Sequence, residues 1–193
     1  MDKVWDQMKS GAWYDAEDVS LRQLRASCKA KLQQFNAMPE SDRQQAIGIL
    51  YTLLDAQEGL NIEAPFRCDY GPNIHLGRNF YANFNFSVLD EADVTIGDHV
   101  FIGPNVGIYT VTHALLPDQR NAGVMRSLPV TIGDNVWIGG NCVVMQGVTI
   151  GDGTVIGAGS VVTRDIPAGV IAFGNPCRVI RPVTEDDRIT EVV

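Results

Sequence analysis

The stretch VTIGDNVWIGGNCVVMQGVTIGDGTVIGAGSVV, residues 130–162, repeats its pattern every six residues. Isoleucine or valine occupies the same place in each repeat from Ile132 to Val162, and the frame recurs upstream at residues 96, 102 and 108. A small or β-branched residue follows four places later. Glycine directly follows the aliphatic residue at positions 97, 103, 133, 139, 151 and 157.

A period of six fits neither an α-helix, with an apolar spacing of ~3.6 residues, nor a single strand, with a spacing of about two. It predicts short strands separated by tight turns and stacked as a parallel β-helix, in which each hexapeptide forms one side of a coil. We expect the aliphatic side chains to point inward and the Gly-Asp or Gly-Asn corners to adopt left-handed backbone angles. The predicted fold class is therefore mainly β, a hexapeptide-repeat β-helix with a small N-terminal helical cap.

Composition suits a globular protein and argues against two kinds of partner. The chain has 193 residues, 45% of them hydrophobic, a formal net charge of −8 and a pI near 4.7. An acidic chain is a poor ligand for nucleic acid or an anionic membrane, so neither is expected as a partner. The opening MDKVWDQMKSG lacks the apolar run of a signal peptide, and residues 46–54 are too few to span a bilayer. Four scattered cysteines without a CxxC pair predict reduced, packed thiols and a cytoplasmic location.

Residues 1–60 are poor in glycine and predict the helical cap. An apolar stripe at helical spacing runs through Leu21, Leu24, Cys28, Leu32 and Phe35. A second helix is expected to follow, with Ser41 and Gln44 forming a capping box at its start. The β-helix is assigned to residues 61–183, and a polar tail to residues 184–193.

The segment 114–130 keeps the six-residue count but breaks the chemistry of the repeat. Threading it through the β-helix would place Arg120 and Arg126 at aliphatic positions and Asp118 at a partner position. Burying these charges unpaired would cost several kcal/mol each. We therefore expect a loop that leaves the β-helix and returns, and long loops of this kind often carry function. The coils between residues 65 and 93 are expected to be irregular.

The chain has histidines at positions 75, 99 and 113, and His113 is the candidate general base. It ends the last regular hexapeptide at the root of the excursion, between a rigid coil and a loop. Histidine side chains exchange protons near neutral pH, which suits base catalysis. The alternative is a corner histidine bonded to a backbone carbonyl. His75 and His99 adjoin turns and are interpreted as surface residues.

A zinc site is the competing interpretation of the histidines. One class of hexapeptide β-helix enzymes binds zinc through three histidines for carbonic anhydrase chemistry. Such a site resembles two histidines close in sequence plus a third a coil or so away. No second histidine lies near His113 in the sequence, so no metal is predicted.

Several segments resemble the maltose and galactoside O-acetyltransferases, and the resemblance covers roughly residues 5 to 183. The Gly11-Ala-Trp-Tyr-Asp15 segment is similar to their N-terminal cap. The other matching segments are Phe66-Arg-Cys-Asp-Tyr-Gly71, Asn73-Ile-His-Leu-Gly-Arg-Asn-Phe-Tyr-Ala-Asn-Phe84, Thr110-Val-Thr-His113, Ile132-Gly-Asp-Asn-Val-Trp-Ile-Gly139, Val161-Val-Thr-Arg-Asp-Ile-Pro167 and Gly174-Asn-Pro-Cys-Arg-Val-Ile180.

This resemblance implies a left-handed parallel β-helix, although parallel crossovers are usually right-handed. It also implies a homotrimer with three active sites between adjacent subunits. The reaction would move an acetyl group from acetyl-CoA to a sugar hydroxyl, commonly the 6-OH, with His113 taking the hydroxyl proton. The oxyanion that forms needs hydrogen-bond donors; the sequence does not identify them, although a backbone N–H would serve.

For the acceptor sugar, the resemblance implies contacts from Asp15, Asp69, Tyr81, Asn83, Glu91 and Met125. Asp69 matches the maltose-type motif, where galactoside enzymes tend to have serine. Glu91 falls where galactoside enzymes carry aspartate, and the choice between Asp90 and Glu91 stays open because alternate strand residues face opposite sides. The alternatives are an N-cap for Asp15, strand and turn filling for Tyr81 and Asn83, and loop packing for Met125.

For the donor, the resemblance implies contacts from Trp137, Gly140, Ala158, Thr163, Arg164, Arg178 and Arg181. CoA is long and multiply anionic, so basic residues should lie at its phosphate end. Where many relatives carry lysine, Arg164 keeps the charge but changes the geometry. Small residues at 140 and 158 would allow backbone contacts with pantetheine. The alternatives are solvated charge at the chain end and, for Trp137, plain packing.

Two other functions stay open. Within the same class, the chain could be a nodulation-type enzyme that acetylates the ends of chitooligosaccharides. Outside it, the β-helix could be a non-catalytic binding or scaffold protein. Release of the CoA thiol in the presence of different acceptors distinguishes these functions.

Overall fold

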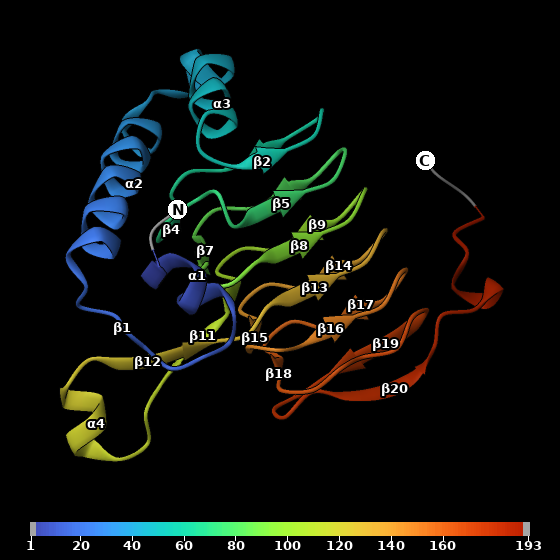
Figure 1. Cartoon of the computed structure of the whole chain (residues 1–193). Helices are drawn as coiled ribbons and strands as arrows, with labels where there is room; N and C mark the ends of the chain where they lie inside the picture. Colours follow the sequence, from blue (N-terminus) through green and yellow to red (C-terminus); the bar gives the residue numbers. More distant parts are fainter. Residues whose placement is uncertain (1–2, 191–193) are drawn as a thin grey trace.

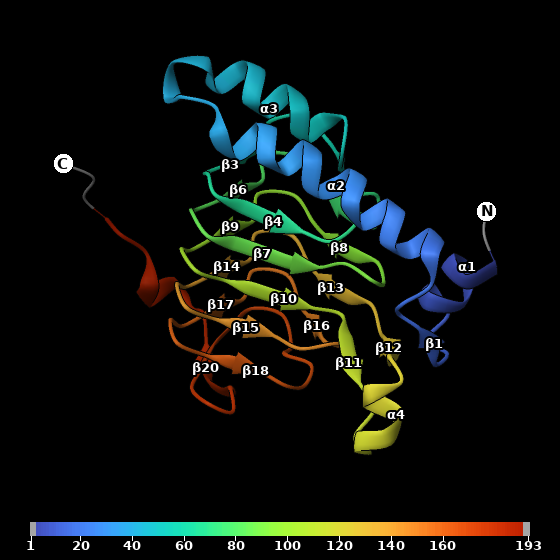
Figure 2. The same ribbon diagram turned by 90° about the vertical axis from the view of Figure 1, so that its left-hand side faces the viewer.

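Three parallel sheets form the sides of a β-helix in the computed structural model, which describes residues 3–190 (Figure 1, Figure 2). The chain visits the sheets in a fixed order, so each coil adds one strand to each side. This confirms the predicted parallel β-helix.

The strands of each side are paired in the order of successive coils. Sheet 1 contains β2 (Asp55–Ala56), β5 (Ile74–Leu76), β8 (Val94–Ile96), β13 (Val130–Ile132) and β16 (Thr149–Ile150). Sheet 2 contains β3 (Asn61–Ile62), β6 (Tyr81–Ala82), β9 (Phe101–Ile102), β14 (Trp137–Ile138), β17 (Val155–Ile156), β19 (Val170–Phe173) and β20 (Arg178–Pro182). Sheet 3 contains β4 (Phe66–Cys68), β7 (Phe86–Leu89), β10 (Gly107–Tyr109), β15 (Val143–Val144) and β18 (Val161–Val162).

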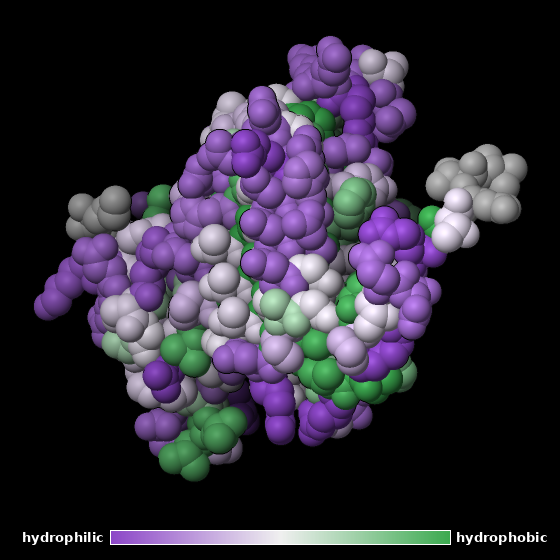
Figure 3. Space-filling model, turned by 90° about the vertical axis from the view of Figure 1, so that its right-hand side faces the viewer, coloured by the Kyte–Doolittle hydropathy of each residue, from purple (hydrophilic) through white to green (hydrophobic). Residues whose placement is uncertain are grey.

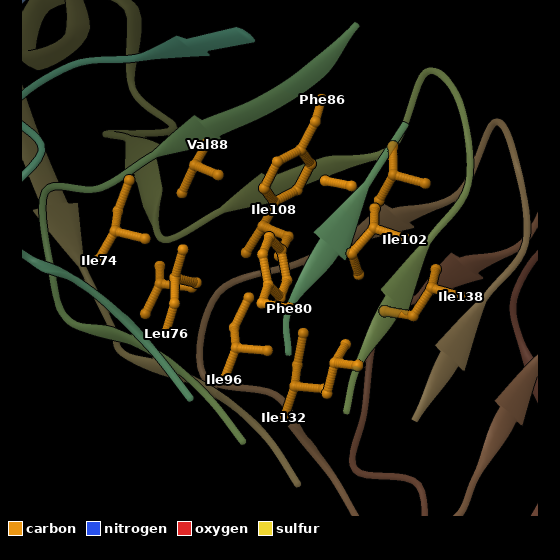
Figure 4. Packing of buried hydrophobic residues seen from close by; sticks show 14 of the residues in the cluster. Ile74, Leu76, Phe80, Phe86, Val88, Ile96, Ile102, Ile108, Ile132 and Ile138 are labelled. Carbon is orange, nitrogen blue, oxygen red and sulfur yellow. The ribbon is translucent and has the colours of Figure 1, made fainter. Parts of the chain in front are cut away.

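The aliphatic residues of the repeat form the core, as predicted. In register along sheet 2, Ala82, Ile102, Ile138 and Ile156 stack above one another, and each is almost fully buried. Figure 4 shows the labelled isoleucines and phenylalanines of neighbouring coils converging in the interior. Each such side chain contributes about 1.5–3 kcal/mol by leaving water. The repeat therefore encodes one continuous hydrophobic column.

The corners adopt left-handed backbone angles, as predicted, but the first glycine of each corner is not the residue that does so. The residues with positive φ are Asn79, His99, Asn135 and Gly153 where sheet 1 turns into sheet 2, and Asn85, Asn105, Asn141 and Gly159 where sheet 2 turns into sheet 3. Asparagine tolerates this region. The first glycines serve close approach instead, because a Cβ at Gly77 would lie 2.5 Å from the carbonyl carbon of Gly97. Coil stacking, which the local sequence does not reveal, sets this requirement.

Three helices lie at the N-terminal end: α1 (Lys3–Lys9), α2 (Val19–Ala37) and, after a 3-10 turn at Glu40–Asp42, α3 (Arg43–Tyr51). Asp18 caps α2 by accepting a hydrogen bond from the Ser20 N–H at 2.8 Å. The expected capping box of Ser41 and Gln44 is wrong. Helix α3 begins one residue after Asp42, and the Ser41 hydroxyl contacts that aspartate instead.

Helix α2 covers the upper end of sheet 3 (Figure 2). Its buried residues Leu32 and Phe35 belong to the same core cluster as Phe66 of β4. The Asn36 side chain donates to the Phe66 carbonyl and accepts from the Phe66 N–H, both at 2.9 Å. These two bonds pair backbone groups in the first strand of sheet 3. The helix therefore closes the N-terminal end of the β-helix.

The excursion has its own structure. Strand β11 (Val111–His113) runs antiparallel to β12 (Val124–Ser127), and β12 runs antiparallel to β1 (Tyr14–Asp15). A short helix, α4 (Pro117–Asn121), joins β11 to β12 at the outer end of this ribbon (Figure 2). The guanidinium Nε of Arg126 donates to the Gly11 carbonyl at 2.7 Å. The excursion thus keeps Arg120 exposed and gives Arg126 a partner outside the core.

The β-helix ends in an antiparallel hairpin of β19 and β20, followed by a 3-10 turn at Glu185–Asp187. All four cysteines are free and buried. No helix within residues 3–190 is long and apolar enough to cross a membrane.

Candidate active site

His113 lies on one face of the excursion ribbon beside two other side chains. Strand pairing places Met125 opposite both His113 and Tyr14, so the three residues form a row across β11, β12 and β1. Directly paired residues of antiparallel strands point to the same face. Tyr14 is buried with Tyr70 and Leu21, and Met125 packs against that cluster. His113 is at the exposed end of the row, where a substrate could reach it.

Asp90 holds the turn that carries Asp69. Its carboxylate accepts hydrogen bonds from the backbone N–H groups of Asp69 and Tyr70, both at 2.9 Å, and of Gly71 at 2.7 Å. Burial raises the pKa of Asp90 to about 6, and the three N–H groups oppose that rise. The carboxylate is therefore ionised at neutral pH, and both of its oxygens accept hydrogen bonds from backbone N–H groups.

Glu91 is the neighbouring acid, and its surroundings differ from those of Asp90. Only 4% of the residue is exposed. Burial, followed by the charge of Asp69, raises the pKa of Glu91 to about 8. The charge of Asp69 acts on Glu91, and Lys29 Nζ is 3.6 Å from Asp69 Oδ1. Asp69 and Glu91 therefore influence each other, whereas the Asp90 carboxylate is occupied by backbone N–H groups.

Tyr14, Tyr70 and Arg25 surround these acids, and the sequence interpretation missed all three. Arg25 Nη1 donates to the Tyr70 hydroxyl at 2.7 Å, and its Nη2 donates to the Ala16 carbonyl at 2.8 Å. Burial raises the pKa of Tyr14 and of Tyr70, and the charge of Glu91 adds to both rises. Tyr14 and Tyr70 lie in two of the segments that resemble the family, next to Asp15 and Asp69. That position could have identified both tyrosines as candidates.

Asp15 lies on β1, one residue from Tyr14, and is exposed. Its Oδ1 accepts a hydrogen bond from the Glu17 N–H at 2.8 Å, so it closes a short turn before α2. The N-cap alternative for Asp15 is wrong, because Asp18 fills that role.

Tyr81 and Asn83 lie elsewhere, in a groove of about 440 Å³ on sheet 2. Trp137, Gly140 and Ala158 line the same groove, so the structure brings these five predicted residues together. The Tyr81 and Phe101 rings are 6.2 Å apart, and Phe101 and Trp137 are more than half exposed. Figure 3, the view from the right of Figure 1, shows hydrophobic atoms gathered in patches among hydrophilic ones.

The groove depends on missing side chains. A Cβ at Gly139 would lie 2.6 Å from the backbone nitrogen of Ala158, and one at Gly140 would lie 3.1 Å from the Pro104 carbonyl oxygen. The narrow space over exposed backbone fits a slender chain such as pantetheine.

The basic residues follow different strands. Thr163 and Arg164 come after β18, on sheet 3, and are exposed, whereas Arg178 and Arg181 belong to β20, on sheet 2. Arg181 forms a two-pronged ion pair with Asp187, at 2.7 and 2.6 Å. Arg178 donates to the Cys177 carbonyl at 2.8 Å. Arg164 and Arg178 are therefore better placed than Arg181 to meet a phosphate.

One chain does not bring the two halves together. His113 follows sheet 3 at the corner that leads to sheet 1, and sheet 2 is the side opposite that corner. Figure 1 shows β11 and β12 on the left and β14 and β17 on the right. A second pocket of about 810 Å³, between α2 and sheet 3, includes Asp69 and Tyr109 but none of the groove residues. In residues 3–190, no group of three His, Cys, Asp or Glu side chains is placed to bind a metal ion.

Three family models match the chain. They describe a maltose acetyltransferase hexapeptide capping motif at residues 7–56, a hexapeptide repeat of succinyl-transferase at 93–112, and a bacterial transferase hexapeptide (six repeats) at 129–164. Nodulation protein L of Rhizobium meliloti (strain 1021) is 45% identical over 175 residues, which are 90% of this chain and 96% of that protein.

Two solved structures are similar over nearly the whole chain. A maltose O-acetyltransferase from Clostridium difficile 630 has a TM-score of 0.92 and 45% identity, covering 95% of this chain and 99% of its own. A galactoside acetyltransferase in complex with coenzyme A has a TM-score of 0.92 and 41% identity, covering 97% of this chain and 94% of its own.

Proposed function

The chain belongs to the hexapeptide-repeat acetyltransferase family of these maltose and galactoside enzymes, and from this premise we propose that it acetylates a sugar hydroxyl with acetyl-CoA as donor. The 6-OH is the proposed position. The observation that carries the proposal is the row of His113, Met125 and Tyr14 beside the acids Asp69 and Glu91. It supports a base beside a cluster of hydrogen-bonding groups, which is what a sugar acceptor needs.

His113 is the proposed general base. It removes the proton of the acceptor hydroxyl while that oxygen attacks the thioester carbonyl carbon. The carbon–sulfur bond then breaks, and the proton passes to the departing CoA sulfur. A positioned base of this kind contributes ~10²–10⁴-fold to the rate. Asp15, Asp69, Glu91 and Met125 are the proposed acceptor contacts on the same side of the chain.

A neighbouring chain supplies the donor side in this proposal. The groove with Trp137, Gly140 and Ala158 lies on the side of the β-helix opposite the His113 corner, so a second copy must bring it to His113. Tyr81 and Asn83 line that groove and would reach the acceptor from the neighbour. Repeating a head-to-tail contact with threefold rotation closes a ring, which gives a homotrimer with three active sites.

The proposed path of CoA runs along the groove. Pantetheine lies over the exposed backbone near Gly140 and Ala158, with Trp137 beside the thiol. Thr163, Arg164 and Arg178 contact the phosphates, and Arg181 contributes only if its pair with Asp187 opens. The proposed location is the cytoplasm, which the four free cysteines support.

The test uses the purified full chain with acetyl-CoA and four acceptors: maltose, glucose, isopropyl thiogalactoside and chitobiose. Thiol release with maltose, glucose or the galactoside is the expected result. Since Nodulation protein L of Rhizobium meliloti is 45% identical, release with chitobiose alone would favour the chitooligosaccharide alternative. No release with any acceptor would contradict the proposal and favour a scaffold.

A further inference from the structure

Glu91 has a carboxylate oxygen that no donor satisfies. Its Oε2 is buried and, among the residues that the structure describes, contacts no hydrogen-bond donor. An ionised carboxylate left without donors in the interior costs several kcal/mol. Buried polar atoms nearly always have a hydrogen-bond partner, so an unpartnered one needs an explanation.

A second carboxyl group, that of Asp69, acts on Glu91. The Asp69 N–H bonds to Asp90, the residue before Glu91, so the two carboxyl groups are neighbours, and two ionised carboxylates there would repel each other. Lys29 is 3.6 Å from Asp69, and 64% of its side chain is exposed, so it favours the charge on Asp69 rather than on the buried Glu91. Arg25, the interior cation, is already committed to Tyr70 and Ala16.

We propose that Asp69 and Glu91 hold one proton between them, and that this acid pair positions the hydroxyl groups of a neutral sugar. A protonated Glu91 can donate a hydrogen bond to Asp69, and the uncompensated charge on its buried carboxyl group is removed. The Glu91 proton is used in that bond, so the pair offers the acceptor the remaining lone pairs of the Asp69 carboxylate, which accept hydrogen bonds from sugar hydroxyl groups. Beyond the acceptor contact proposed above, Glu91 is a positioning residue here, because it also acts through Asp69. This inference rests on the proposed function for its acceptor.

The charged and titratable groups around the pair come from every element packed against it. They are Asp90 beside Glu91, Tyr14 on β1, Tyr70 and Cys68 on the first coil, Arg25 and Lys29 on α2, and His113 on the same ribbon as Tyr14. Burial keeps Tyr14 and Tyr70 protonated, and Asp90 stays ionised on three backbone N–H groups. Since the pKa of Glu91 is raised to about 8, it is the group that titrates on the alkaline side.

The kinetic test compares the acceptor KM at pH 7 and pH 9.5 in the wild type and in Glu91→Gln. Loss of the shared proton should raise the wild-type acceptor KM by at least about tenfold over this range, because binding needs the protonated pair. Gln cannot ionise, so the ratio of the two KM values should stay near one in Glu91→Gln. The KM for acetyl-CoA is the internal control and should not follow the acceptor KM. Equal ratios in both proteins would overturn the positioning role.

An infrared spectrum without any substrate separates the proton from the catalysis. The wild type at pH 7 should show the C=O stretch of a buried protonated carboxyl group, which disappears at pH 9.5 and is absent in Glu91→Gln. Asp93→Asn is the matched control, because that neighbouring carboxylate is paired with Lys9 and its removal should leave the band. No such band would overturn the acid pair whatever the activity. A band without turnover of any sugar would overturn the positioning role and the proposed function but not the shared proton.

Discussion

His113 is the proposed general base. Replacing His113 with Ala should lower kcat by ~10²–10⁴-fold, because the hydroxyl proton then has no positioned acceptor. The acceptor KM should change much less, since the proposed acceptor contacts include the acids Asp69 and Glu91. Steady-state thiol release measures both constants.

His99 provides the matched control for this substitution. It is exposed at a left-handed corner with φ 57°, and Asn occupies the equivalent corners at 79 and 135. His99→Asn should therefore keep wild-type turnover. Near-normal turnover in His113→Ala would show that another group takes the proton.

Glu91 links proton binding to stability. Its pKa is raised from 4.5 to about 8 in the folded state, so the folded chain holds a proton that the unfolded chain releases between these values. Stability from this group is complete below pH 4.5 and is lost as the pH rises toward 8. The loss is at most about 1.4 kcal/mol per pH unit.

Glu91→Gln should therefore gain free energy of unfolding relative to the wild type as the pH rises from 5 to 8. Denaturant titrations at pH 5, 6.5 and 8, at one protein concentration, measure the difference. Parallel stability curves for the two proteins would mean that Glu91 does not hold its proton.

At the scale of single residues, the sequence predicted part of the candidate site. The motifs nominated Asp69 and both Asp90 and Glu91, but alternation alone could not separate the last two. The separation comes from three backbone N–H groups that converge on Asp90 from a turn about 20 residues earlier. Tyr14 joins Glu91 only because the excursion pairs with the N-terminal segment. No local pattern records such a long-range contact.

At the scale of the elements, neighbouring coils stack with their backbones so close together that some corners have room only for glycine. Gly77→Ala should destabilise the fold by about 1–3 kcal/mol, because its Cβ would lie 2.5–2.6 Å from the carbonyl group of Gly97 in the next coil. Backbone atoms of a stacked coil cannot move aside. The free energy of unfolding from denaturant titration measures the effect.

Gly48→Ala is the control for that substitution. Gly48 lies in α3, a Cβ there would meet nothing within 4 Å, and Ala favours the helix by up to about 1 kcal/mol. The two variants should therefore change stability in opposite directions. Equal effects would show that coil contact does not explain the glycines.

The helices and strands could be predicted where the sequence has a clear apolar period. The six-residue frame gave the strands of the later coils, and the helical stripe gave α2, with Leu21, Cys28, Leu32 and Phe35 buried. The exception in the stripe is Leu24, which is 46% exposed. The start of α3 and the β11–β12 ribbon escaped prediction, because a 3-10 turn and a partner strand from residues 14–15 decide them.

At the scale of the whole molecule, we propose that one active site needs two chains. The His113 corner and the groove of sheet 2 lie on different sides of the β-helix. Composition and periodicity could not show this division, since it depends on which corner follows which sheet. The exposed Phe101 and Trp137 are consistent with a neighbour over sheet 2.

Mixing two inactive variants tests this claim most directly. His113→Ala removes the base, and Ala158→Trp fills the groove; the mass of each assembly is checked before and after subunit exchange. Random mixing in equal amounts should restore about a quarter of wild-type activity, because half of the chains carry His113 and half of their neighbours carry an open groove. Activity no greater than the sum of the separate variants, in assemblies shown to have mixed, would mean that both halves of the site lie on one chain.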